Sequence, residues 1–293
     1  MNTEKNGRAI FLMVVSMGAF AAADALVKVS TGSLSTYQVM VLLFGGGCLV
    51  FGLIAKLQGD PLFDRRAFSP ILLFRYVAEI IGMLAMVTAF AKVPISAVGA
   101  ITQATPLVAA VGAVLFLNEK VGWRRWLTIG VGFLGVLLII QPGTAEFNAS
   151  MLWAVLALIA LSARDLNTRM VPADIPSASL AMFTSSASLP VVIALALFNG
   201  DTVLPHDPNW IVIIPMVVLG SFGYILLITS LRMAAVSVVM PFRYARILFL
   251  MIIGVWVFDE KPNSQMLIGA TLIIASGIYI IWREQQIKNL NIN

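Results

Sequence analysis

ADALVKV at residues 23–29 and RDLNTRM at residues 164–170 are the two stretches that decide the fold. In each, an aspartate near the end of an apolar run is followed four residues later by a base. A shift of 141 residues, without a gap, aligns Asp24 with Asp165 and Lys28 with Arg169. The same shift also aligns Gly59-Asp60 with Gly200-Asp201, Gly82 with Gly223, Thr88 with Thr229, Ser96 with Ser237, and Glu119-Lys120 with Glu260-Lys261. A chance register would match Ala, Val and Leu easily, but it accounts poorly for recurring charged pairs. The chain is therefore predicted to contain two copies of one unit.

The composition places the chain in a membrane. Of the 293 residues, 60% are hydrophobic and 11% are charged, and the mean hydropathy is +0.95. Soluble domains have about 45–50% apolar and about 25% charged residues. Because the apolar runs are close to the roughly 20 residues that cross a bilayer, we expect an all-α polytopic membrane protein.

Ten apolar windows lie between polar breaks, so each copy has five helices. The expected spans are 8–28, 35–56, 69–91, 94–117, 123–141, 149–168, 177–198, 209–231, 236–257 and 264–283. The predicted first repeat is 1–142, the second is 149–284, and 285–293 is a cytoplasmic tail. Since five is odd, the second copy must enter the membrane from the opposite side. Twelve Lys and Arg residues in the loops or at the ends of the spans fall on the N-terminal side and three on the other, which predicts that both termini are cytoplasmic.

Several functional classes are disfavoured. The net charge is +5, but the bases punctuate apolar stretches instead of forming a patch, so no nucleic-acid partner is expected. No Cys/His/carboxylate cluster has metal-ligand spacing, and no Walker A pattern occurs, so no metal, cofactor or catalytic residue is predicted. An integral membrane enzyme, such as a lipid-modifying one, would need clustered His or acidic residues. A scaffold or receptor would not need arginines within its spans. Inverted repeats are instead typical of secondary transporters.

Two motifs, each at the end of a predicted helix, resemble those of a known family. FLNEK (116–120) and VFDEK (257–261) each precede a Gly-bearing apolar span. These motifs are similar to those of the drug/metabolite transporter superfamily, in its ten-helix EamA-type branch, and the resemblance covers essentially the whole chain. It implies a multi-pass carrier of the bacterial inner membrane with a central cavity and a small organic substrate.

Within that branch, PFRYARI (241–247) and RYVAE (75–79) look most like carriers for riboflavin uptake or S-adenosylmethionine uptake. Riboflavin uptake is the leading expectation. S-adenosylmethionine or amino-acid transport, as uptake or export, is the alternative. LLFGGGC (42–48) departs from the Arg-Phe pair that many relatives have there, which disfavours export that depends on that arginine. The sequence does not specify a coupling ion, and it allows either a monomer or a homodimer.

The ninth predicted span carries the leading substrate-binding candidates. Arg243 and Arg246 are three residues apart and share a helix face near the midplane, where a charge costs about 2.5–3.5 kcal/mol. Either can bind an anionic or electron-rich group, with Tyr244 available for stacking, or both can pair with carboxylates elsewhere in the bundle. Thr102 and Gln103 occupy the matching positions of the first repeat and are also substrate-binding candidates.

The remaining candidates concern gating or coupling. Arg75 and Glu79 are at i and i+4, so they can pair on one face. Alternatively, Arg75 contacts substrate and Glu79 is a proton-linked group. Asp24 with Lys28 and Asp165 with Arg169 are expected to be helix-end ion pairs that act as gates or anchors. The Glu-Lys pairs at 119–120 and 260–261 are expected to hold tight turns. Arg164 is a further candidate, which the repeat does not explain because its counterpart is Ala23.

Overall fold

A computed structural model describes residues 3–105, 107–108, 111–112, 123–142, 148–168, 170–172, 174–233 and 239–290. All regular structure among these residues is helical. The α-helices are α1 Thr3–Ser30, α2 Thr36–Gln58, α3 Pro70–Lys92, α4 Ile95–Thr102, α6 Trp123–Ile140, α7 Met151–Thr168, α8 Ser177–Phe198, α9 Trp210–Met233, α11 Ala245–Phe258 and α12 Ser264–Leu290. Two short 3₁₀ helices are η1 Arg65–Phe68 and η2 Met240–Tyr244.

Six helices in the described part of the chain are long and apolar enough to cross a membrane. These are in α1, α2, α3, α7, α8 and α9, and two shorter apolar helices occupy Trp126–Ile140 and Ser264–Tyr279. Large apolar side chains face outward from the bundle, among them Phe198 at 91% exposure and Ile211 at 86%. A soluble protein rarely exposes so much contiguous apolar surface. The chain is therefore a polytopic membrane protein.

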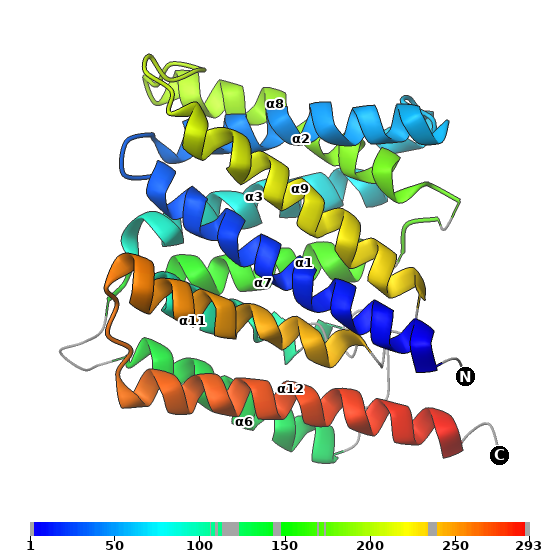
Figure 1. Ribbon diagram of the computed structural model, residues 1–293, viewed down its shortest axis with the longest axis vertical. Helices are drawn as coiled ribbons and strands as arrows, with labels where there is room; N and C mark the ends of the chain where they lie inside the picture. The colour runs from blue at the N-terminus through cyan, green and yellow to red at the C-terminus, as the bar shows by residue number, and fades with distance from the viewer. Residues whose placement is uncertain are drawn as a thin grey trace.

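The helices pair across the two halves of the sequence. The strongest contacts join α1 with α9, α3 with α7, α2 with α8, and α6 with α12. Figure 1 shows these helices side by side, with α6 and α12 together at one end of the stack. Exchanging the first five helices for the second five leaves this set of pairs unchanged, because α1·α9 becomes α7·α3. Helix pairing thus follows the register found in the sequence.

Glycines at matching positions also make matching contacts. Gly59 and Gly200 have φ of 74° and 80° and end α2 and α8 in the left-handed conformation that glycine adopts without a Cβ penalty. A Cβ at Gly82 in α3 would lie 2.5 Å from Leu161 in α7. A Cβ at Gly223 in α9 would lie 3.3 Å from the ring of Phe20 in α1. Since Leu161 and Phe20 are themselves 141 residues apart, both crossings use one packing solution.

Two spans that were predicted as continuous helices are interrupted. The span expected at 94–117 stops as α4 at Thr102, and Gln103 and Ala104 form a turn. The span expected at 236–257 begins, in the described residues, as the 3₁₀ helix η2. Pro106 itself lies outside the described residues, but its missing N–H cannot serve the Thr102 carbonyl. The Thr105 hydroxyl donates to that carbonyl at 2.6 Å instead.

The ends of the chain differ from expectation at one point. Helix α12 continues to Leu290, so most of the predicted tail 285–293 extends the last helix. Gln and Lys in this stretch are good helix formers, which favours the extension. Both termini lie at the same end of the helices in Figure 1.

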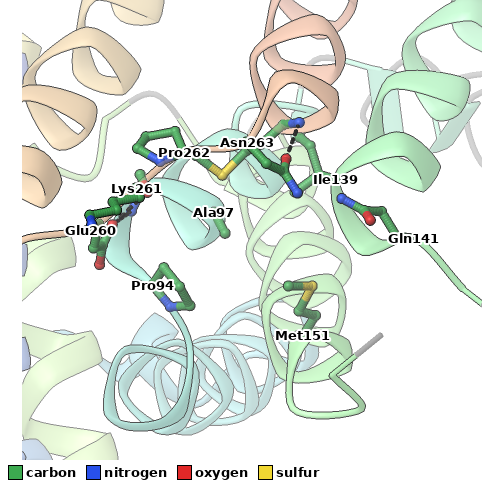
Figure 2. A pocket seen from close by; sticks show the side chains of 11 residues that line it. Pro94, Ala97, Ile139, Gln141, Met151, Glu260, Lys261, Pro262 and Asn263 are labelled. Atoms are coloured by element: carbon green, nitrogen blue, oxygen red, sulfur yellow. Dashed lines mark hydrogen bonds between the residues drawn. The ribbon is translucent and has the colours of Figure 1, made fainter. Parts of the chain in front are cut away.

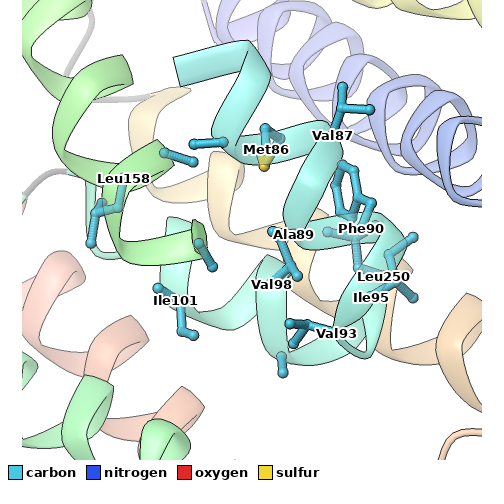
Figure 3. Packing of buried hydrophobic residues seen from close by; sticks show 14 of the residues in the cluster. Met86, Val87, Ala89, Phe90, Val93, Ile95, Val98, Ile101, Leu158 and Leu250 are labelled. Carbon is cyan, nitrogen blue, oxygen red and sulfur yellow. The ribbon is translucent and has the colours of Figure 1, made fainter. Parts of the chain in front are cut away.

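The largest buried cluster surrounds the turn between α3 and α4. Figure 3 shows Phe90, Val93 and Ile95 of this turn near Leu250 of α11, with Leu158 of α7 at the other side of the cluster, toward Ile101. Gly99 allows the close approach, because a Cβ there would lie 2.5 Å from Leu250. The packed turn holds α3 and α4 against the second half at the end of the bundle where Lys28 lies.

Candidate functional site

Seven charged side chains from both halves of the chain form one group within the bundle. We call them the intramembrane charge cluster: Asp24 of α1, Arg75 and Glu79 of α3, Arg164 and Asp165 of α7, Arg243 of η2 and Arg246 of α11. Each is a residue type that is expensive in hydrocarbon, so the group is expected to border protein or water and not lipid. Partial exposure of Arg164 (24%) and Asp165 (34%) fits a water-accessible border.

Arg164 connects α7 to α3 through two carboxylates. Its Nη1 donates to both oxygens of Glu79, at 3.0 and 2.9 Å. Its Nε and Nη2 donate to Asp165 Oδ1, at 3.0 and 2.7 Å. The planar guanidinium suits this double contact because its donors form a rigid fork. The arginine that the repeat leaves unexplained is therefore the bridge between α3 and α7.

Arg75 and Glu79 do not pair with each other, although their i, i+4 spacing allows it. Arg75 is 6% exposed, and it donates to Thr168 Oγ1 at 3.1 Å and to Thr184 Oγ1 at 2.7 Å. Glu79 turns to Arg164 instead. Neighbouring helices offer each charge a partner at better distance than its own helix does. Arg75 thereby joins α3 to both α7 and α8.

Asp24 also pairs across helices and not with Lys28. Its Oδ2 accepts from Arg246 Nε at 3.0 Å and from Arg246 Nη2. The Arg246 guanidinium lies 5.4 Å from the ring centroid of Phe20, one helical turn before Asp24. The ion-pair prediction for Asp24 and Lys28 is thus corrected, because α11 places a stronger partner against α1. Arg169, the predicted partner of Asp165, lies outside the described residues.

Lys28 belongs to a second group of contacts, near the end of α1. Its Nζ donates to the carbonyls of Phe90 at 3.2 Å and Val93 at 2.8 Å, where α3 ends. Cations are favourable at a helix C-terminus, where carbonyls lack intrahelical partners. Glu260 Oε1 lies 3.9 Å from the same Nζ.

Glu260 does more than hold a turn, which was its predicted role. Its carboxylate accepts from the backbone N–H of Ile95 at 2.6 Å and of Ser96 at 3.1 Å, and from Ser96 Oγ at 2.5 Å. It therefore caps the start of α4 from the loop before α12. Figure 2 shows Glu260 and Lys261 beside Pro94 and Ala97, at the rim of a pocket of about 180 Å³. The equivalent Glu119 and Lys120 lie outside the described residues.

Replacing Glu260 with Gln is expected to lower the free energy of unfolding by about 1–3 kcal/mol, because amides at the start of α4 lose a charged acceptor. The change is measured as a lower unfolding temperature in detergent. Lys261→Gln is the matched control, since it removes a charge next door but keeps the carboxylate. Equal unfolding temperatures for the two variants would contradict the capping role.

Outside the spans, Arg66 joins two loops. It contacts Asp64 at 2.7 Å and Asp174, between α7 and α8, at 2.5 Å. Hydrogen bonds from Arg66 hold the pKa of both carboxyl groups below their usual values. A lowered folded-state pKa means that this clamp stabilises above the ordinary carboxyl pKa and is lost as the pH falls. The effect is small because the side chains of Arg66 and Asp174 are largely exposed to solvent.

The interruptions of the two broken spans meet each other. Gln103 Nε2 donates to the Arg243 carbonyl at 2.9 Å, so the end of α4 touches η2. Thr102 Oγ1 donates to its own helix, to Val98 O at 2.9 Å and Gly99 O at 3.1 Å. Interrupted helices at corresponding places of two repeats are a frequent site of substrate binding in transporters.

Tyr244 lies away from this meeting point. It is 5% exposed, and a Cβ on Gly277 of α12 would fall 1.4 Å from its hydroxyl oxygen. Because Gly277 has no side chain, α12 leaves room for the Tyr244 ring. Stacking of Tyr244 on substrate, which its sequence position suggested, does not fit this packing.

The sequence profile of the "EamA-like transporter family" matches residues 7–141 and again residues 148–283. The chain belongs to this family. Members of the family and the named relatives are transporters and not enzymes, so this EamA-family chain is a multi-pass transporter of the bacterial inner membrane with a small-molecule substrate.

Curated relatives of this EamA-family chain include transporters named for two different substrates. An "S-adenosylmethionine uptake transporter" of Rickettsia felis is 27% identical over 278 residues, covering 93% of this chain and 92% of the relative. A "Riboflavin transporter" of Vibrio cholerae is 28% identical over 210 residues, covering 71% of this chain and 70% of the relative. One solved crystal structure shares the fold, with a TM-score of 0.63 at 16% identity over 95% of this chain and 98% of the other.

Sequence reasoning missed four contributors to the site of this EamA-family chain: Phe20, Thr168, Thr184 and Glu260. Phe20 has a detectable signal, since it precedes Asp24 by one helical turn. The threonines have none, because hydroxyl residues are common in spans. Among the described residues, no group of three His, Cys, Asp or Glu side chains lies close enough to hold a metal ion.

Proposed function

We propose that the chain moves a small zwitterionic metabolite by alternating access between two inverted five-helix repeats, with both termini cytoplasmic. Three observations support the repeats: the exchange symmetry of helix pairing, the matching glycine contacts, and the family profile that matches twice. Two similar halves of opposite orientation give inward-open and outward-open states of similar energy around one midplane site.

The intramembrane charge cluster carries the proposal. It draws side chains from α1 and α3 in one half and from α7, η2 and α11 in the other. Relative movement of the halves would therefore break and remake its contacts. The cluster presents carboxylates and guanidinium groups together, which suits a ligand with charges of both signs. With a neutral ligand, the carboxylates and guanidinium groups of the cluster would have only one another as charged partners, in the inward-open and in the outward-open state.

S-adenosylmethionine matches this chemistry best. It carries a carboxylate, an ammonium group and a sulfonium, together with an adenine ring. Arg243, whose backbone meets Gln103 at the two helix breaks, is the candidate for the substrate carboxylate. Its side chain is also within electrostatic range of Asp165. The relatives named for this substrate align over more than nine-tenths of the chain.

Riboflavin, the leading expectation from sequence, is the second candidate. It has no charged group, and its flat ring system would need aromatic neighbours. The edge-to-face pair of Phe51 and Tyr224, with centroids 5.2 Å apart, offers one such surface. The relatives of that name align over about seven-tenths of the chain.

Uptake by vesicles tests the choice. Purified protein in proteoliposomes is expected to accumulate labelled S-adenosylmethionine above protein-free vesicles, and unlabelled S-adenosylmethionine should abolish the signal while riboflavin leaves it unchanged. Counterflow from preloaded vesicles shows that exchange is carrier-mediated. Accumulation of riboflavin without S-adenosylmethionine would transfer the assignment to the second candidate. Exchange of neither would overturn both.

A further inference from the structure

One part of the cluster has the chemistry of a cation-binding site. The Asp24 carboxylate and the Phe20 ring occupy successive turns of one face of α1, and both contact Arg246. The side chains of Asp24 and Arg246 are 13% and 24% exposed, so part of each charged group is accessible from outside the packed helices. A carboxylate beside an aromatic face attracts a cation through charge and through the ring quadrupole.

We propose that Asp24 and Phe20 form the subsite for the sulfonium of the substrate, and that Arg246 occupies it until the substrate arrives. This inference rests on the proposed function, because it assigns one group of S-adenosylmethionine to one place. A trialkyl sulfonium has no hydrogen to donate, so a ring face and a carboxylate are the groups that can recognise it. The guanidinium that fills the subsite in this structure is a cation of the protein's own.

The Phe20 ring is held in place from behind. Its carbon atoms lie 3.3 Å from where a Cβ on Gly223 would be, so α9 supports one side of the ring. The Arg246 guanidinium lies on the ring from α11. A ring fixed in this way loses little side-chain entropy when a ligand replaces the guanidinium.

The repeat shows that this subsite exists once. The positions that match Phe20, Asp24 and Arg246 are Leu161, Asp165 and Thr105. The equivalent site therefore keeps the carboxylate but has a leucine in place of the ring, and the cation on Asp165 is Arg164 of the same helix instead of an arginine from the other half. Such an asymmetric site orients a ligand whose ends differ, with the sulfonium toward α1 and the carboxylate toward Arg243.

Replacement of the Arg246 guanidinium by the sulfonium also gives Arg246 a second role in binding the substrate. Two cations cannot share one carboxylate without repulsion, so the arriving sulfonium must displace the guanidinium from Asp24. The released guanidinium can then pair with the substrate carboxylate. Binding thus breaks a contact between α1 and α11, which lie in opposite halves, and this is a contact that a change of state must loosen.

Comparison of two ligands measures how much the sulfonium contributes to binding. S-adenosylhomocysteine keeps the adenine, ammonium and carboxylate but has a neutral thioether. Inhibition of labelled S-adenosylmethionine uptake by each unlabelled ligand gives a preference ratio for every variant. Phe20→Leu installs the residue that the second half uses at this position, and it is expected to lower the ratio about 3- to 10-fold. Asp24→Asn should lower it about tenfold or more.

Phe20→Tyr is the matched control, because it keeps the ring face and should keep the ratio. Elution of each variant as a single peak from size exclusion shows that it has folded. If wild-type protein takes up no S-adenosylmethionine, the proposed function fails. If wild-type protein takes it up but shows no preference over the thioether, the subsite is overturned. The same holds if Phe20→Leu and Asp24→Asn weaken both ligands equally or leave the ratio unchanged.

Discussion

Arg164→Ala is expected to lower the free energy of unfolding by about 3–5 kcal/mol and to abolish transport, because it leaves two carboxylates in the bundle without their cation. Glu79 is 12% exposed and Asp165 is 34% exposed in their side chains, and Arg164 is a hydrogen-bond donor to both. Without it, each carboxylate must take up a proton or draw in water. The measurement is the unfolding temperature in detergent, together with uptake in proteoliposomes.

A double variant separates the lost bridge from a loss of packing. Glu79→Gln removes one of the two uncompensated charges, so it should restore part of the stability that Arg164→Ala loses, with a coupling energy of about 0.5–3 kcal/mol. Arg164→Lys keeps the charge but not the fork, and should fall between wild type and alanine. Strict additivity of the Glu79 and Arg164 changes would show that the contact has no energetic role.

Gly135→Ala is expected to destabilise the pair of α6 and α12 by about 1–3 kcal/mol. A Cβ at Gly135 would lie 2.6 Å from the carbonyl oxygen of Gly269, and a Cβ at Gly269 would lie 2.5 Å from that of Gly135. Backbone atoms cannot swing aside as side chains do, so the helices must separate. Small residues that let backbones approach in this way are a recurring feature of membrane helix pairs. The loss is measured as a lower unfolding temperature.

Gly130 on the same helix offers the control. No heavy atom lies within 4 Å of where its Cβ would be, so Gly130→Ala should be neutral or stabilising by up to about 0.5–1 kcal/mol through helix propensity. The same substitution five residues apart is thus expected to have opposite signs. Similar losses at both positions would show that the close crossing does not limit stability.

Much of the architecture could be predicted without coordinates. Apolar length located the helices, and charged pairs at a constant shift revealed the register that later appeared in Gly59 with Gly200 and in helix pairing. Interruption of the fourth and ninth spans was missed. Helical periodicity does not show whether the carbonyl freed by a proline is satisfied by a hydroxyl, as Thr105 satisfies Thr102.

The partners of the charges were the main error. The i, i+4 spacing predicts an ion pair between Asp24 and Lys28 and allows one between Arg75 and Glu79. Within a single helix, residues three or four apart are the only ones whose side chains meet, so the sequence of one helix shows no other partner. In the folded bundle, Asp24 instead forms an ion pair with Arg246, and Glu79 forms one with Arg164. An interhelical partner brings a fully formed ion pair with additional hydrogen bonds, whereas an intrahelical one at the same level would leave its neighbour across the interface unpaired.

Membrane residence and the all-helical class follow from the order of residues, because the bilayer imposes length and hydrophobicity on each segment separately. Which charges meet, where a ring supports a carboxylate, and which acid caps α4 depend on helices far apart in the chain. Only the tertiary structure decides these, since a buried charge takes the best partner that packing brings within reach, at whatever distance in sequence.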